Sequence, residues 1–224
     1  QAMRMGSAVD VMLFQPETYK VLVIPEKLSR SKAKANLKAK QAILDEAKAE
    51  DKPWLSQCDF DRARRIVDAI RADPEAGELL RHPYETQMEI VWNCPWPNYP
   101  KIGHIDYFYD VIVDLKTTAL WNIHPNRLGT HTYNYGIHRQ IAHYQEGVEA
   151  ATGRLLPTKI LYAASEPPYE VVVMDIDGDE LALGHHENQK TCLELKEAMT
   201  YDDWSSKWRT RSRKIKFPTW AFAE

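Results

Sequence analysis

Three short segments of β-type composition, 86–92, 101–107 and 110–116, constrain the fold of this 224-residue chain more than any other feature. Tight, Pro- and Asn-rich connections separate them, so we expect a β-meander. Two further strands are predicted at 158–164 and 169–176. Because helical segments precede, interrupt and follow the strands, we predict an α/β fold in which helices flank a central mixed sheet.

The predicted helices follow from apolar periodicity and from capping residues. They cover residues 7–15, 31–50, 59–73, 75–81, 130–151 and 178–199. Ser7 and Asp10 have the spacing of a capping box, and Asp59 is a candidate N-cap. Gly153 is a candidate for the left-handed residue that ends the helix at 130–151.

The length and the 44% hydrophobic content are those of one domain with one sizeable core. We expect this domain to span 1–224, with a helical part at about 1–82, a sheet core at about 83–200 and a basic segment at 201–224. The three cysteines are too widely spaced for a disulfide framework or a metal cluster. The chain has neither a long apolar run nor a signal-peptide pattern, so we expect a cytoplasmic protein that does not contact a membrane.

The 29 basic and 32 acidic residues nearly cancel, so the net charge neither requires nor excludes a polyanionic partner. The basic residues gather in two clusters, Lys27, Arg30, Lys32, Lys34, Lys38 and Lys40, and Lys207, Arg209, Arg211, Arg213, Lys214 and Lys216. Each cluster could follow the phosphates of DNA. A solvated helix face explains the first equally well.

Asp114 and Lys116 are two residues apart in a predicted strand, so their side chains share one face. Asp106, on the preceding strand, can face Asp114 if the two strands pair as a hairpin. Two facing carboxylates repel, which favours a hard cation such as Mg²⁺ between them. Such a cation could activate water against a phosphodiester, with Lys116 stabilising the transition state. The alternative is an ordinary ion pair at a strand end.

The order of short motifs resembles a known family. Gly103-x-x-Asp106 followed by Ile112-Val113-Asp114-Leu115-Lys116 resembles the signature of the PD-(D/E)xK nuclease superfamily, whose core has αβββαβ order, as in restriction endonucleases. Gln140-x-x-x-Tyr144 has the form found on the next helix in RecB-like and phage-exonuclease branches. Further similarity to RecE-type (exonuclease VIII) domains lies in Gly6–Asp10, His82-Pro83 and Phe217–Ala221.

The resemblance implies roles for individual residues. Asp106 and Asp114 would be metal ligands, the Leu115 carbonyl a third ligand and Lys116 the catalytic lysine. Gln140 and Tyr144, four residues apart on a helix, would reach the DNA end or position the site. The implied cofactor is Mg²⁺ or Mn²⁺, as one or two ions. The candidate DNA contacts are His138, Arg139, Arg209, Arg211, Arg213 and Lys214.

Two positions depart from the RecE-like pattern. Asp10 stands where these proteins usually carry a histidine, and it is either a third carboxylate ligand or the capping acid opposite Ser7. The family's first-strand glutamate falls on Gln87, so Glu89 is the alternative metal ligand if the register shifts slightly.

The function implied by the resemblance is exonucleolytic degradation of linear double-stranded DNA, 5′ to 3′, in phage-type recombination. The implied partners are DNA ends and a single-strand annealing protein, and the implied assembly is a homo-oligomeric ring of three or four chains. The cell would be bacterial or phage-infected. The alternatives are a structure-specific or restriction-like endonuclease and a catalytically degenerate DNA-binding protein.

Overall fold

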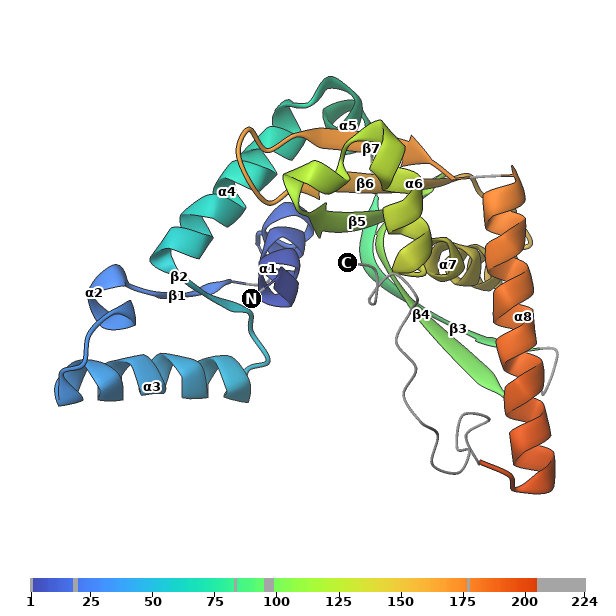
Figure 1. The fold of residues 1–224 in the computed structure, drawn as a ribbon, viewed down its shortest axis with the longest axis horizontal. Coiled ribbons are helices and arrows are strands. Elements are labelled where there is room, and N and C mark those ends of the chain that lie inside the picture. Colours follow the sequence, from blue (N-terminus) through green and yellow to red (C-terminus); the bar gives the residue numbers. More distant parts are fainter. Residues whose placement is uncertain (1, 18–19, 83, 95–98, 177, 205–224) are drawn as a thin grey trace, which may run out of the picture.

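A central five-stranded sheet organises the computed structural model, which describes the chain except for residues 1, 18–19, 83, 95–98, 177 and 205–224 (Figure 1). The strands run in the order β3-β4-β5-β6-β7, with bounds Glu85–Asn93, Pro100–Phe108, Ile112–Thr118, Thr158–Ala164 and Val171–Asp175. All neighbours are antiparallel except β5 and β6, which are parallel. The predicted mixed sheet is confirmed, and so is the meander.

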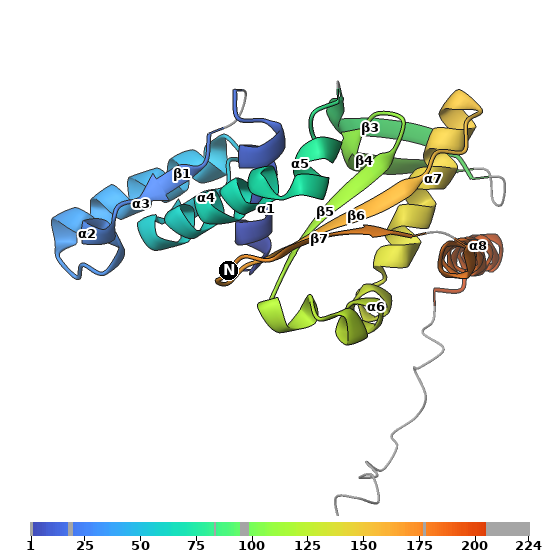
Figure 2. The same cartoon turned by 90° about the horizontal axis from the view of Figure 1, so that it is seen from above.

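Helices cover both faces of this sheet (Figure 2). One layer holds α1, α4 and α5, and the other holds α6, α7 and α8; their bounds are Ala2–Phe14, Gln57–Ala72, Pro74–Leu79, Pro125–Asn134, Ile137–Thr152 and Gly178–Tyr201. Alternate residues of β5 face the two helical layers. Val113 and Leu115 pack with α1 and α4, and Ile112 packs against α7. Asp114 therefore stands in a strand that is covered on both sides.

A second, smaller sheet was not predicted. It pairs β1 (Leu22–Ile24) in parallel with β2 (Trp54–Ser56), and α2 (Glu26–Ser29) and α3 (Lys34–Ala49) lie between these strands in sequence. Figure 1 shows this unit projecting from the main sheet beyond α1. Strands of three residues are too short to give a recognisable alternation in the sequence.

Two predicted helix starts are wrong. Helix α1 begins at Ala2, so Ser7 lies inside it, where its hydroxyl donates to the Met3 carbonyl at 3.1 Å. Helix α4 is capped by Ser56, whose Oγ accepts from the Asp59 N–H at 3.2 Å. A serine in the helix interior can bond back to the preceding turn, so the capping-box spacing of Ser7 and Asp10 does not require a helix start there.

The single helix predicted at 130–151 is two helices. Gly136 has φ of +65° and separates α6 from α7, since a left-handed residue cannot continue an α-helix. A further short 3₁₀ turn, η1 (Leu120–Asn122), precedes α6. The predicted left-handed end at Gly153 is confirmed, with φ of +70°.

Helix α7 lies very close to β3 at Gly147. A Cβ at this position would come within 2.5 Å of Ile90 Cδ1 and 2.8 Å of the Trp92 ring. The Trp92 indole is held in place because its N–H donates to Glu146 at 3.1 Å. Gly147 therefore sets the distance at which α7, with Gln140 and Tyr144, crosses the sheet.

We expect Gly147→Ala to destabilise the protein by about 1–2 kcal/mol, because overpacking outweighs the gain in helix propensity. Urea denaturation measures the change. Gly129→Ala on α6 is the matched control, since nothing lies within 4 Å of its Cβ position. That variant should be stabilised by up to about 1 kcal/mol. Equal effects of the two substitutions would contradict the proposed close approach.

Candidate active site

The β4 and β5 strands part at the candidate site. Their backbone pairing joins only Tyr107 to Val113 and Phe108 to Ile112, and the next facing positions are Asp106 and Asp114. Beyond the last backbone pair, the Leu115 N–H donates to Asp106 Oδ2 at 2.9 Å. The Asp106 side chain thus bridges the diverging strands, and it faces Asp114 as the predicted alternation requires.

Asp114 is buried, with an exposed fraction of 1%. Its Oδ2 contacts the Lys116 ammonium, yet no donor among the described residues satisfies hydrogen-bond geometry to this oxygen. Burial raises the pKa of Asp114, and the nearby Lys116 opposes that rise. Burial makes the charged form of this carboxylate costly, and a metal ion beside it would offset part of that cost.

Helix α1 brings a third carboxylate to the site. Asp10 is partly buried, and the Gln87 amide donates to both of its oxygens, at 3.1 and 3.0 Å. Burial, and then the charge of Asp114, raises the pKa of Asp10 to about 6, while Lys116 lowers it. The capping role considered for Asp10 is wrong, because α1 runs through Ser7 and this side chain faces the site carboxylates.

Gln87 has an unusual backbone that coincides with this contact. Its φ is +50°, and the β3–β4 pairing passes from Thr86 and Tyr107 to Met88 and Ile105 without a recorded bridge between Gln87 and Asp106. A left-handed residue other than glycine costs on the order of 1 kcal/mol or more. The RecE-like pattern marks Gln87 only as a position where a metal-binding glutamate is absent, and no local signal in the sequence identifies it as the partner of Asp10.

The pKa of Asp106 is raised to about 7, chiefly by burial and then by the charges of Asp114 and Asp10; the Leu115 N–H and Lys116 act in the opposite direction. The site therefore gathers three carboxylates around one ammonium. This excess of negative charge fits a hard divalent cation.

The side chains do not form a closed cage. Among the described residues, no three His, Cys, Asp or Glu side chains are grouped closely enough to hold an ion by themselves. Asp106 and Asp114 would hold the metal together with the Leu115 carbonyl and water, which is the incomplete protein shell that Mg²⁺ commonly has.

In metal-free buffer, we expect Asp106→Asn to raise the free energy of unfolding near pH 8, by on the order of a few kcal/mol. The folded-state pKa of about 7 lies above the ordinary value of 3.8, so the folded protein binds the extra proton between these values. Stability from this group is therefore present at about pH 4 and is lost as the pH rises to about 7. The side-chain amide of the Asp106→Asn variant cannot ionise, so the variant does not lose this stability. Its carbonyl oxygen can still accept the hydrogen bond from the Leu115 N–H.

Urea denaturation with a chelator at pH 5.5 and pH 8 tests this expectation. The difference between the variant and the natural protein should widen at the higher pH. Asp110→Asn is the control, because Asp110 is exposed and pairs with Arg154 at 2.7 Å. A pH-independent difference for Asp106→Asn would contradict the assigned coupling.

Helix α7 carries Gln140 and Tyr144, and both side chains lie over one side of the sheet. The Gln140 amide donates to the Tyr144 hydroxyl at 2.7 Å, and the tyrosine ring packs against Gly103, where a Cβ would lie 3.1 Å from it. Burial, followed by the charge of Asp114, raises the pKa of Tyr144 to about 12. The phenol therefore stays protonated at neutral pH, close enough to Asp114 to respond to its charge.

Other predicted site residues lie elsewhere. Glu89 is exposed on β3, where its carboxylate is 3.9 Å from His104 Nε2, and it is not among the acids that shift the pKa values of the cluster. Arg139 bonds to Asn188 and Thr191 on α8. Arg209, Arg211, Arg213 and Lys214 lie outside the described residues.

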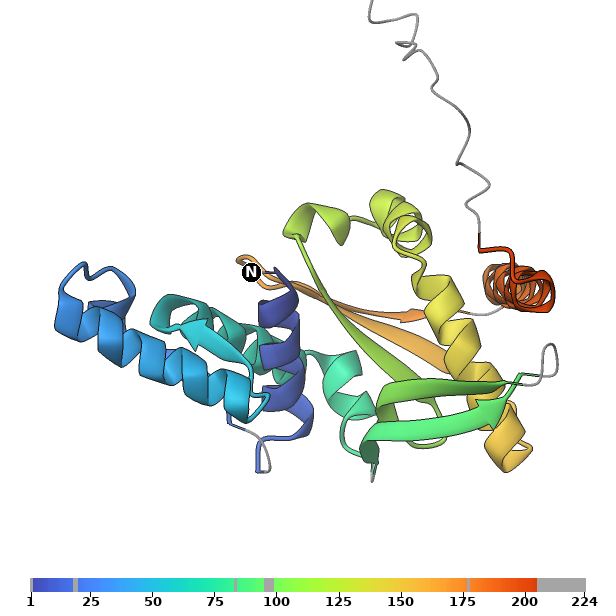
Figure 3. The ribbon, with the colours of Figure 1, turned by 90° about the horizontal axis from the view of Figure 1, so that it is seen from below.

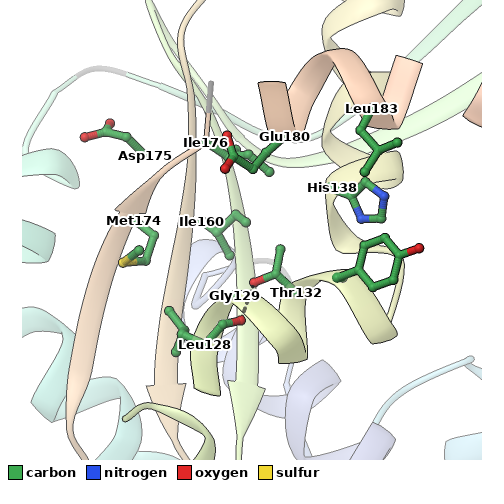
Figure 4. Close-up of a pocket in the computed structure, with 11 residues that line it drawn as sticks. Leu128, Gly129, Thr132, His138, Ile160, Met174, Asp175, Ile176, Glu180 and Leu183 are labelled. Atoms are coloured by element: carbon green, nitrogen blue, oxygen red, sulfur yellow. Dashed lines mark hydrogen bonds between the residues drawn. The ribbon is translucent and has the colours of Figure 1, made fainter. Parts of the chain in front are cut away.

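His138 is buried rather than available to DNA. Its exposed fraction is 4%, its Nε2 lies 3.1 Å from Glu187, and Tyr133 stacks on its ring. It lines an apolar pocket of about 370 Å³ between α6, α8 and the β6–β7 edge (Figure 4). None of the cluster carboxylates lines this pocket, so it is separate from the candidate active site.

The fold and the family comparison place the protein in the class of PD-(D/E)xK-like domains. The chain belongs to the family described as PDDEXK-like domain of unknown function (DUF3799), whose model matches residues 1–209. The predicted restriction-endonuclease-like core is thereby confirmed. Within the described part of the chain, no helix is both long and apolar enough to cross a membrane.

A solved structure has a similar fold. A crystal structure described as a putative exonuclease from Eubacterium rectale matches with a TM-score of 0.59 and 19% identity, over 88% of this chain and 68% of that chain. The crystal structure of SSO0001 gives a TM-score of 0.33 at 13% identity, over 92% and 87% of the two chains, which is too loose to support an argument. A comparison with curated proteins gave no significant match.

Proposed function

We propose that this nuclease is a Mg²⁺- or Mn²⁺-dependent exodeoxyribonuclease that degrades linear double-stranded DNA from 5′ to 3′. The observation that carries the proposal is the facing of Asp106 and Asp114 where β4 and β5 part, with Lys116 in contact with Asp114. The resemblance to RecE-type domains supports the exonuclease activity and the direction. The Eubacterium rectale structure, described as a putative exonuclease, supports the same activity.

The residues of the site have distinct roles in this proposal. Asp106, Asp114 and the Leu115 carbonyl would hold the metal, with Asp10 as a further acid beside it. When bound, the metal would supply a Lewis acid and an activated water for phosphodiester hydrolysis. The Lys116 ammonium stabilises negative charge on the phosphate in the transition state. Tyr144, protonated at neutral pH and bonded to Gln140, can donate a hydrogen bond to a phosphate oxygen.

Labelled DNA tests the proposal. Linear duplex carrying a label at one 5′ end or one 3′ end should release mononucleotides only with Mg²⁺ or Mn²⁺, and the 5′ label should be released first. Closed circular duplex should remain intact. Cutting of circles would instead identify an endonuclease on the same fold, and binding without hydrolysis would identify a degenerate DNA-binding protein.

In a recombination pathway, the resulting 3′ overhang would be a substrate for a single-strand annealing protein. The resemblance to RecE-type proteins also favours a ring of three or four chains. Light scattering of the purified protein measures the mass, and a monomeric mass with full activity would contradict the ring.

A further inference from the structure

One hollow adjoins the carboxylate cluster and a second lies at the end of β5, and each carries an arginine next to a tryptophan ring. The larger, about 830 Å³, contains Asp10 and Gln87 in its wall. Arg4 and Trp54 line the same hollow, with the Arg4 guanidinium carbon 3.9 Å from the centre of the Trp54 ring. Asp51 also lines it, so this surface is not uniformly basic.

The second hollow, about 380 Å³, lies at the end of β5 and is lined by Trp121, Arg127, His131 and Tyr135. The Arg127 guanidinium carbon is 4.7 Å from the centre of the Trp121 ring. The exposed fractions of Trp121 and Tyr135 are 60% and 75%, which is high for large aromatic side chains. This surface is therefore aromatic, positively charged and open to a ligand.

Side-chain contacts connect the second hollow to β5, the strand that carries Asp114 and Lys116. The Asn122 amide donates to Thr118 Oγ1 at 2.8 Å, and His131 Nε2 lies 3.3 Å from the same hydroxyl. Thr118 ends β5, two residues beyond Lys116. These contacts place Trp121 at the point where the strand that carries Asp114 and Lys116 leaves the sheet.

The first turns of α1 connect the two hollows. Gly6 packs against the end of β5, where a Cβ would lie 3.2 Å from Thr117 Oγ1, and Arg4 and Ser7 line the larger hollow. Figures 1 and 3 both show the start of α1 beside the end of β5. One arginine–tryptophan pair therefore lies on the α1 side of the cluster, and the other follows the end of β5.

Both surfaces suit nucleobases without selecting among them. Every base has a flat face that stacks on an aromatic ring, and an arginine beside the ring adds attraction for the strand's phosphates. Inside a duplex these faces are covered by neighbouring bases, so, apart from the outer face of a terminal pair, the rings could reach them only in an unpaired strand. We propose that the two hollows bind unpaired bases of the strand that is cleaved, one beside Asp10 and the other beyond the end of β5, so that the strand is single-stranded where it crosses the carboxylates. This inference rests on the proposed function.

Binding of a fluorescein-labelled oligothymidylate, followed by anisotropy in a chelator so that no cleavage occurs, tests the inference. Trp54→Ala and Trp121→Ala should each weaken binding by about five-fold or more, since one stacked base contributes at least about that factor. Trp204→Ala is the matched control. Trp204 is 64% exposed but lies beyond the end of α8. The affinity of the Trp204→Ala variant for the oligonucleotide should change by less than about two-fold.

Unchanged affinity in both Trp54→Ala and Trp121→Ala would overturn the inference. If either variant fails to fold, Arg4→Met and Arg127→Met address the same surfaces, and they too should weaken binding. The two proposals fail separately. Oligonucleotide binding that depends on the tryptophans, without any hydrolysis in Mg²⁺, would refute the proposed nuclease activity and retain the base-binding surfaces. Hydrolysis together with binding that does not depend on the tryptophans would refute the base-binding surfaces and retain the proposed nuclease activity.

Discussion

Asp114→Asn should abolish hydrolysis of linear duplex DNA, with a fall in rate of about 10³-fold or more, because the buried ligand loses its charge. The same variant should lose the increase in melting temperature that Mg²⁺ or Mn²⁺ gives to the natural protein, since an ion that binds only the folded state stabilises it. Nucleotide release and thermal melting with and without the ion measure the two effects.

The control is Asp175→Asn on β7. Asp175 pairs with Lys159 at 2.5 Å, so it reproduces the aspartate–lysine pair on the neighbouring edge of the same sheet, but it is exposed. Activity and the metal-dependent shift should both survive there. If Asp114→Asn keeps either property at the natural level, Asp114 is not a metal ligand.

Lys116→Met should lower the rate by about 10²- to 10³-fold while metal binding persists, because this lysine is assigned to the transition state and not to the ion. Removing its positive charge also removes a competitor for the cation beside Asp114. The metal-dependent increase in melting temperature should therefore be retained. This separation of rate from metal binding distinguishes Lys116 from Asp114.

Lys159→Met is the comparison for Lys116→Met. The two lysines lie on adjacent strands, each pairs with an aspartate, and their side chains are 25% and 26% exposed. Only Lys116 lies beside the carboxylate cluster. Comparable losses of activity in the two variants would point to a general effect on the sheet and would refute the catalytic role.

Periodicity along single strands accounts for the part of the site that could be predicted. The alternation of β4 and β5 requires only a hairpin for Asp106 and Asp114 to face each other, and the structure has that hairpin. Helical periodicity likewise predicts the buried face of α4. Its core residues are Ala63, Ile66, Val67 and Ile70. Local sequence determines such features because the partners are near in the chain or share one element.

Contacts between distant segments account for most of what was missed. Gln87 and Asp10 are 77 residues apart, and no periodic pattern relates them. Trp54 reaches the site through a three-residue strand, which is too short to be recognised. The break at Gly136 depends on a backbone angle that one glycine permits but does not require.

The hydrogen bonds between Gln87 and Asp10 connect the two positions at which the sequence departs from the RecE-like pattern. RecE-like proteins are expected to carry histidine on the helix and glutamate on the strand, whereas here the helix supplies the acid and the strand supplies a neutral amide. At this junction the carboxylate comes from the helix, whereas the RecE-like pattern has it on the strand. The two positions should therefore be strongly epistatic, and a homologue sequence that changes one of them is expected to compensate at the other.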